Sequence, residues 1–155
     1  MRVLIAILLL SLLTDPSILC DAESSTSPDS PFDQYGTISW EDEKARLDNF
    51  AIQLQNNKKC TGYILVFDKT NGCPGEATAR GIRARRYITE YRGIPWNQVM
   101  WRREGSREDV RTTLLIAPPG VTLSFPTLDS TSPSIDGPLT RACQKRLERI
   151  RKSRW

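Results

Sequence analysis

Apolar and polar residues alternate along residues 35–118 in patterns that predict strands and helices in turn. Starting at Leu47, apolar side chains recur at i, i+3, i+4 and i+7, which is typical of one buried face of an amphipathic helix. Ser39, followed by three acidic residues, favours the start of that helix. Residues 60–68 are a compact run rich in β-branched and aromatic residues and predict a central strand buried on both faces.

A second helix is predicted within residues 75–91, where small and apolar residues recur at helical spacing. The predicted buried stripe consists of Ala77, Gly81, Ala84, Ile88 and Tyr91. Because three of these five residues are small, we expect this helix to lie close to a sheet. Its arginines Arg80, Arg83 and Arg86 form a second stripe on another side.

Three further strands are predicted from short apolar runs. Residues 35–40 alternate as in a short strand, and residues 97–103 and 110–118 predict two more, joined by the polar residues 104–109 as an antiparallel hairpin. The order is β-α-β-α-β-β. Such an order predicts an α/β sandwich, with a mixed sheet and two helices on one face.

The flanking segments differ in composition from residues 35–118. Arg2 and the apolar run at 3–13 are typical of a secretory signal within residues 1–22, too short to span a bilayer. We therefore expect export to the periplasm or the extracellular space, with no transmembrane span in the mature chain. Cys20 is either removed with the signal or lipidated, and the sequence leaves both open. Residues 23–34 predict a flexible polar linker.

After the predicted sandwich, a Pro/Ser/Thr-rich segment covers residues 119–138, and a basic tail covers residues 139–155. The tail could form a short helix with few apolar contacts. Its cations suit an anionic surface, although a tail that only aids solubility is equally consistent with this composition. The whole chain carries a formal net charge of +4, which is mildly basic.

Histidine is absent from the chain, which excludes Ser-His-Asp and Cys-His catalytic arrangements and histidine metal sites. Cys60, Cys73 and Cys143 have no CxxC spacing, so zinc and redox motifs have no support. In an exported protein one pair of these cysteines is expected to form a disulfide and leave an odd thiol, and the pairing stays open. We predict no enzymatic activity, no cofactor and no metal.

Two stretches resemble the C-terminal OmpA-like domain of bacterial envelope proteins. They are "LDNFAIQLQNNKKCTGYILVFDK" (47–69) and "GEATARGIRARRYITEYRGI" (75–94). The family pattern is a helix "LDxLAxxLxxNP", a strand ending in "GHTD", and a helix "NxxLSxxRAxxVxxYLxxxGI". The resemblance covers residues 35–117 and is closest to a branch of small exported, uncharacterised proteins of acidobacterial type. The chain departs from the pattern at two places: "FDKT" (67–70) replaces "GHTD" at the end of the strand, and "NxxLS" is missing from the second helix.

The resemblance implies peptidoglycan binding. In that family an arginine on the second helix and an aspartate at the strand end hold a carboxylate-bearing peptide of peptidoglycan, and a guanidinium suits a planar carboxylate. Alignment on Tyr87-Ile88 brings the family arginine to Arg80, and Asp68 is the approximate counterpart of the aspartate. A plain ion pair between Arg80 and Asp68 is the simpler interpretation of the same residues.

Arg83, Arg85 and Arg86 are further candidates for phosphate contacts, with Arg83 and Arg86 as a surface for polyanions, although a solvated helix face is the usual explanation of such a run. A nucleic-acid partner is not expected, because the chain carries an export signal. Trp96 and Trp101 could stack on sugar rings, but packing in the core is the more common role for such residues.

The sequence thus predicts an exported, non-catalytic protein of the cell envelope that binds peptidoglycan through a degenerate OmpA-like pocket. The alternative is an exported protein-protein interaction module that has kept the fold, lost this ligand and binds an envelope protein.

Overall fold

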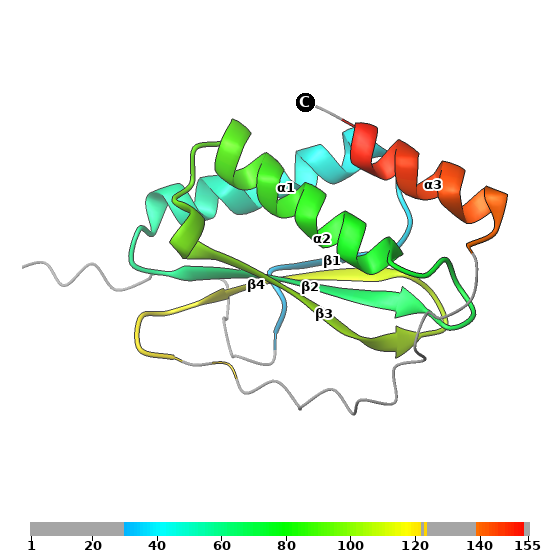
Figure 1. Cartoon of the computed structure of the whole chain (residues 1–155). Coiled ribbons are helices and arrows are strands. Elements are labelled where there is room, and N and C mark those ends of the chain that lie inside the picture. Colours follow the sequence, from blue (N-terminus) through cyan, green and yellow to red (C-terminus); the bar gives the residue numbers. More distant parts are fainter. Residues whose placement is uncertain (1–29, 122, 124–138, 154–155) are drawn as a thin grey trace, which may run out of the picture.

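A mixed four-stranded sheet forms one layer of the molecule, and three helices lie together on one side of it (Figure 1). The strands are β1 (Asp33–Tyr35), β2 (Thr61–Lys69), β3 (Val99–Arg107) and β4 (Arg111–Ala117). Their order across the sheet is β1-β4-β2-β3. β2 runs parallel to β3 and antiparallel to β4, and β1 runs antiparallel to β4. The predicted α/β class with a mixed sheet is therefore confirmed.

The helical layer contains three α-helices and two short turns. They are α1 (Trp40–Asn56), α2 (Glu76–Arg86), α3 (Arg141–Lys152), a π-helical turn η1 (Tyr87–Tyr91) and a 3₁₀ turn η2 (Trp96–Gln98). α2 connects the parallel strands β2 and β3, as a crossover must. α3 packs against α2.

This computed structural model describes residues 30–121, 123 and 139–153. The expected signal at 1–22, the fate of Cys20, most of the expected linker and residues 124–138 of the Pro/Ser/Thr-rich segment lie outside these residues. No helix within the described residues is both long enough and apolar enough to cross a bilayer.

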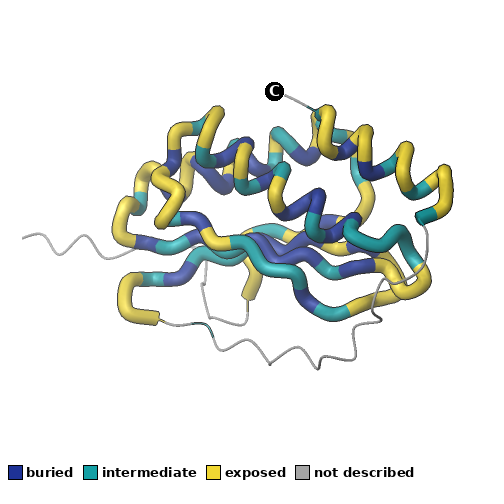
Figure 2. The backbone as a smooth tube through the Cα atoms, viewed as in Figure 1, coloured by how far each residue is buried: buried dark blue, intermediate teal, exposed yellow. Residues whose placement is uncertain are grey.

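The main core lies between the sheet and the helices, where Figure 2 shows the buried positions concentrated. The predicted stripe that starts at Leu47 is fully buried, because Leu47, Phe50, Ala51 and Leu54 are all 0% exposed. Ser39 caps α1, since its hydroxyl accepts a hydrogen bond from the Asp42 backbone N–H at 3.1 Å. The period of apolar residues and the cap thus predicted this helix correctly.

The predicted hairpin of residues 97–118 is wrong. β3 and β4 are not neighbours, because β2 lies between them and pairs with both. β3 also extends to Arg107, through most of the polar run that was expected to be a loop. The physical reason is that a β3–β4 hairpin would leave an edge of β2 open, whereas the observed order satisfies both edges of this strand, whose residues Ile64, Leu65 and Val66 are buried.

The first strand also differs from its prediction. β1 ends at Tyr35, so Asp33 and Gln34 belong to the sheet and not to a linker, and Trp40 begins α1 and does not close a strand. The π-helical turn explains a further difference. Because it inserts an extra residue into the helical repeat, Tyr87 becomes buried and Tyr91, expected in the buried stripe, is 56% exposed.

Candidate functional site

The arginines of α2 are the strongest functional candidates in the sequence, and the structure gives them very different surroundings. Arg80 is only 5% exposed, and its guanidinium forms an ion pair with Glu76, one turn earlier, at 2.9 Å. Glu76 is itself 2% exposed. A second cation, Arg146 of α3, reaches the same Glu76 oxygen at 2.8 Å. A buried carboxylate thus holds two guanidinium groups from two helices.

Helix α3 is docked on this cluster. A disulfide joins Cys73, just before α2, to Cys143 in the first turn of α3. Leu147 and Ile150 pack against Ala79 in a small second core. The expected basic tail is therefore an ordered helix between residues 141 and 152, held by a covalent bond, an ion pair and apolar contacts.

Arg83 was expected on a surface for polyanions, and that prediction is wrong. Its side chain is 9% exposed and pairs with Glu43 of α1, whose side chain is 0% exposed. The guanidinium also lies 4.3 Å from the ring centre of Trp40. Forty residues separate the partners, so local sequence could not reveal the pair. Arg83 can be partly buried because Glu43 and Trp40 replace the water that its charge loses.

Burial dominates the electrostatics of this second cluster. Desolvation raises the pKa of the Glu43 carboxyl, and the charges of Arg83 and Arg80 offset this effect only in part. The same burial lowers the pKa of Arg83. Desolvation, followed by the charge of Glu43, raises the pKa of the Tyr35 hydroxyl, which donates a hydrogen bond to Glu43 at 3.4 Å.

Asp68 lies at the end of β2, as predicted, but it does not pair with Arg80. Its carboxylate forms an ion pair with Arg103 of β3 and accepts a hydrogen bond from the Ala77 backbone N–H at 3.2 Å. Both residues of the predicted peptidoglycan pocket are thus engaged by other groups of the chain. Carboxylate binding by Arg80 and Asp68 stays a prediction, and it would require these internal pairs to open.

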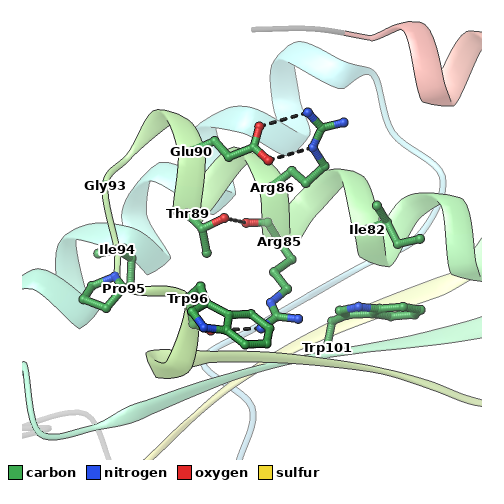
Figure 3. Close-up of a pocket in the computed structure, with 10 residues that line it drawn as sticks. All are labelled: Ile82, Arg85, Arg86, Thr89, Glu90, Gly93, Ile94, Pro95, Trp96 and Trp101. Carbon is green, nitrogen blue, oxygen red and sulfur yellow. Dashed lines mark hydrogen bonds and ion pairs between the residues drawn. The ribbon is translucent and has the colours of Figure 1, made fainter.

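The other two arginines lie at the end of α2, beside an open groove of about 710 Å³ (Figure 3). Arg86 is exposed, as predicted, and forms two hydrogen bonds of 2.9 Å with Glu90. Arg85 lies over the ring of Trp96, 4.2 Å from its centre, and donates a hydrogen bond to the Trp96 carbonyl at 2.9 Å. Trp101 of β3 also lines the groove.

Trp101 packs closely on α2, at Gly81. A Cβ at this position would lie 2.3 Å from the indole, so a glycine is needed for the helix to approach the ring. Trp101 is half-buried against the core, as packing predicts, whereas Trp96 is 69% exposed. The two tryptophans therefore differ, and only Trp96 presents most of its ring to solvent.

The outward side of α3 is basic. Its exposed cations are Arg141, Lys145, Arg149, Arg151 and Lys152. Glu148 lies among them and pairs with Lys152 at 3.8 Å. We call Arg141, Lys145, Arg149 and Lys152 the α3 basic face, because their spacing brings them to one side of the helix.

The described cysteines are all disulfide-bonded, so the odd thiol expected among Cys60, Cys73 and Cys143 is not found. Within the described residues, no group of three or more Cys, Asp or Glu side chains is arranged to hold a metal ion.

Sequence reasoning missed three residues that organise these clusters: Glu43, Glu76 and Arg146. A buried carboxylate is hard to recognise in a sequence. Acidic residues in the first turn of a helix are normally exposed to solvent, where they interact favourably with the helix dipole. The i, i+4 spacing of Glu76 and Arg80 was visible, but it is equally common on exposed helix faces.

No family model matches this chain, and neither a curated protein nor a solved structure matches it.

Proposed function

We propose that this chain is a non-catalytic module of an exported protein that associates with anionic polymers of the cell envelope through the α3 basic face. One observation carries the proposal. The basic helix is fixed on the domain by the Cys73–Cys143 disulfide, the Arg146–Glu76 pair and the burial of Leu147 and Ile150. A helix that served only solubility would need no such attachment.

Fixing the helix matters for binding. Cations on a docked helix keep their spacing, so a polymer that contacts several of them does not have to order the helix first. The exposed cations also create a local positive field on a chain whose net charge is only +4. Peptidoglycan, whose stem peptides carry free carboxylates, is the polymer that fits both the chemistry and the expected export.

We further propose that the fold is a divergent OmpA-like domain, on the support of the β-α-β-α-β-β order of the chain before α3. The family's carboxylate pocket is not the basis of the proposed binding. Arg80 and Asp68 already have the partners Glu76 and Arg103, and this favours contact through α3 instead.

The internal pairing of Arg80 and Asp68 also supports a second candidate. This candidate is an exported interaction module that kept the fold, lost the peptidoglycan ligand and binds a protein of the envelope. The two candidates differ in their charge dependence. Contacts between exposed charges weaken as salt rises, because the screening length is about 8–10 Å at physiological ionic strength.

Co-sedimentation of the purified protein with peptidoglycan sacculi, at low and physiological salt, tests the proposal. The test variant carries Lys145→Gln, Arg149→Gln and Lys152→Gln. The matched control carries Lys58→Gln, Lys59→Gln and Arg111→Gln, which remove equal charge from exposed positions away from α3.

We expect binding of the wild type and the control, and a loss of about tenfold or more in the α3 variant. Equal losses in both variants would mean that only net charge matters, and the α3 basic face would then have no special role. A wild-type protein that stays in the supernatant at both salt concentrations would leave the protein-partner function as the better candidate.

A further inference from the structure

The groove at the end of α2 lies apart from the α3 basic face and contains no residue of α3. Figure 3 shows its two sides: α2 and η1 contribute Ile82, Arg86 and Glu90, and the indoles of Trp96 and Trp101 lie opposite. It is an open depression of about 710 Å³ whose lining combines aromatic, aliphatic and charged side chains, and this volume lies within the range of small-molecule sites.

Arg85 is the unusual residue of this groove. The other arginines of α2, Arg80, Arg83 and Arg86, each pair with a carboxylate. Among residues 30–121, 123 and 139–153, Arg85 has no acidic partner; its contacts are the ring and the carbonyl oxygen of Trp96. One cation at the groove is therefore not neutralised by any carboxylate of the described residues.

The way Arg85 is held favours binding of an external anion. A guanidinium that stacks on an indole uses its flat face, and its N–H donors point outward in the plane of the group. Within the part of the chain that the structure describes, one of these donors is used, by the Trp96 carbonyl. The stacking also limits the rotation of the Arg85 side chain. The guanidinium donors are therefore already partly ordered for a ligand that accepts two parallel hydrogen bonds.

The remaining charges of the groove do not oppose an anion. Glu90 is held by two hydrogen bonds from Arg86, and those bonds lower the pKa of its carboxyl. The charges of Arg86 and Glu90 cancel, so Arg85 leaves the groove with a net charge of +1. A singly charged carboxylate matches this charge better than a phosphate, which carries about −1.5 to −2 at neutral pH.

Aromatic and aliphatic surface lies next to the cation. Trp96 is 69% exposed and Ile82 is 44% exposed, and the indole of Trp101 forms the neighbouring wall. Exposed apolar surface gathered at one polar group is a feature of binding sites, whereas scattered single residues are not. A ring attached to the carboxylate would cover this surface.

We propose that this groove binds a small carboxylate that carries a ring, with the carboxylate on Arg85 and the ring against Trp96 and Trp101. An acidic sugar and an aromatic carboxylate share this chemistry. The inference does not rest on the proposed role of α3, because it uses none of the α3 residues.

The test is a titration of the ¹⁵N-labelled full chain, followed by the indole N–H signals in NMR spectra. The probes are glucuronate and benzoate, with acetate, glucose and inorganic phosphate as comparisons. The partly buried Trp40 indole, packed against Tyr87 and Arg83, is an internal reference for changes unrelated to the groove. Small ligands of this kind are expected to bind with a Kd of about 1 mM.

We expect glucuronate, benzoate or both to shift the Trp96 and Trp101 signals and to leave Trp40 unchanged. Acetate and glucose should bind at least about tenfold more weakly, because acetate has no ring and glucose has no carboxylate. The probe that binds identifies the source: glucuronate indicates an acidic sugar, and benzoate indicates an aromatic acid.

Two variants locate the site. Arg85→Gln should weaken binding by about 10–100-fold, because it removes a charge-assisted fork. Trp96→Ala should weaken it as well, whereas Arg111→Gln, which removes an exposed cation elsewhere, should have no effect. Circular dichroism checks that the variants are folded.

Absence of an indole shift with both ring carboxylates would overturn the proposal. So would equal binding of phosphate, which would indicate a general anion site, or an unchanged affinity in folded Arg85→Gln.

Discussion

The two ends of α2 carry the same kind of side chain in opposite environments. At the N-terminal end and in the middle, Arg80 is buried and Arg83 is partly buried, and each is matched by a buried carboxylate, Glu76 or Glu43. At the C-terminal end, Arg86 is exposed and pairs with an exposed Glu90. An arginine-rich helix is therefore not one surface, and the neighbouring elements decide which cations are structural and which can meet a ligand.

The difference also appears in the carboxyl groups that face these arginines. Burial raises the pKa of Glu43, whereas hydrogen bonds from Arg86 lower the pKa of Glu90. At Glu43, the effect of desolvation on the pKa outweighs that of the paired charge. At the exposed Glu90, hydrogen bonding has the larger effect on the pKa.

Substitution of Arg83 should have the largest effect. Arg83→Ala leaves Glu43 fully buried without its cation and should lower the free energy of unfolding by about 3–5 kcal/mol, measured by urea denaturation. Arg86→Ala is the matched control at the exposed end, where we expect no loss that denaturation resolves.

A double variant separates the ion pair from simple loss of packing. Glu43→Gln with Arg83→Met removes both charges, so it should be more stable than Arg83→Ala alone. If the stability loss of the double variant equals the sum of the losses of the two single variants, the buried ion pair is not the reason for the loss caused by substitution of Arg83.

Removal of the Cys73–Cys143 disulfide should have the next largest effect. Cys73→Ala with Cys143→Ala should cost about 2–4 kcal/mol, because the bond closes a loop across 70 residues of sequence. Hydrogen exchange should accelerate most in α3, while amides of β2 stay protected. Uniform acceleration throughout the domain would show that α3 is part of the main folding unit and not a docked element.

Titration of the two glutamates should show the smallest but most direct contrast. In ¹³C NMR, the carboxyl of Glu43 should titrate above 4.5 and that of Glu90 below it. Arg86→Gln should bring Glu90 back toward 4.5 and leave Glu43 unchanged. Equal midpoints for both residues would contradict the difference in environment.

The sign of the stability change follows from these directions. The raised pKa of Glu43 contributes stability below the unfolded pKa, and this contribution is lost as the pH rises through the folded value. The lowered pKa of Glu90 contributes stability above the unfolded pKa, which is lost as the pH falls through the folded value. Near pH 4.5 the two contributions therefore change in opposite directions.

Local patterns predicted much of the fold. The stripe from Leu47 and the cap at Ser39 defined α1, the apolar run defined β2, and the small residues of α2 correctly indicated close packing on the sheet. Each of these features depends on residues within a few positions of one another. Apolar period and capping chemistry act over the same short range, so the sequence displays them directly.

Candidate site residues were predicted less well. Arg80 was predicted to hold a ligand carboxylate and Arg83 to lie on a surface for polyanions, but each pairs with a carboxylate of the same chain, Glu76 or Glu43. Arg85, the α2 arginine without an acidic partner among the described residues, was named only together with Arg83 and Arg86 and was not distinguished from them. The i, i+3 spacing of arginines gave no sign of which ones would be covered.

The sequence alone was enough to predict the type and order of the elements from β1 to β4 and the α/β class of the fold. Only the tertiary structure decided that β2 separates β3 from β4, that α3 docks on α2, and which arginines are buried. The physical reason is one of range. Periodicity and caps are local, whereas strand order and the desolvation of a charge depend on partners many residues away, as the forty residues between Glu43 and Arg83 show.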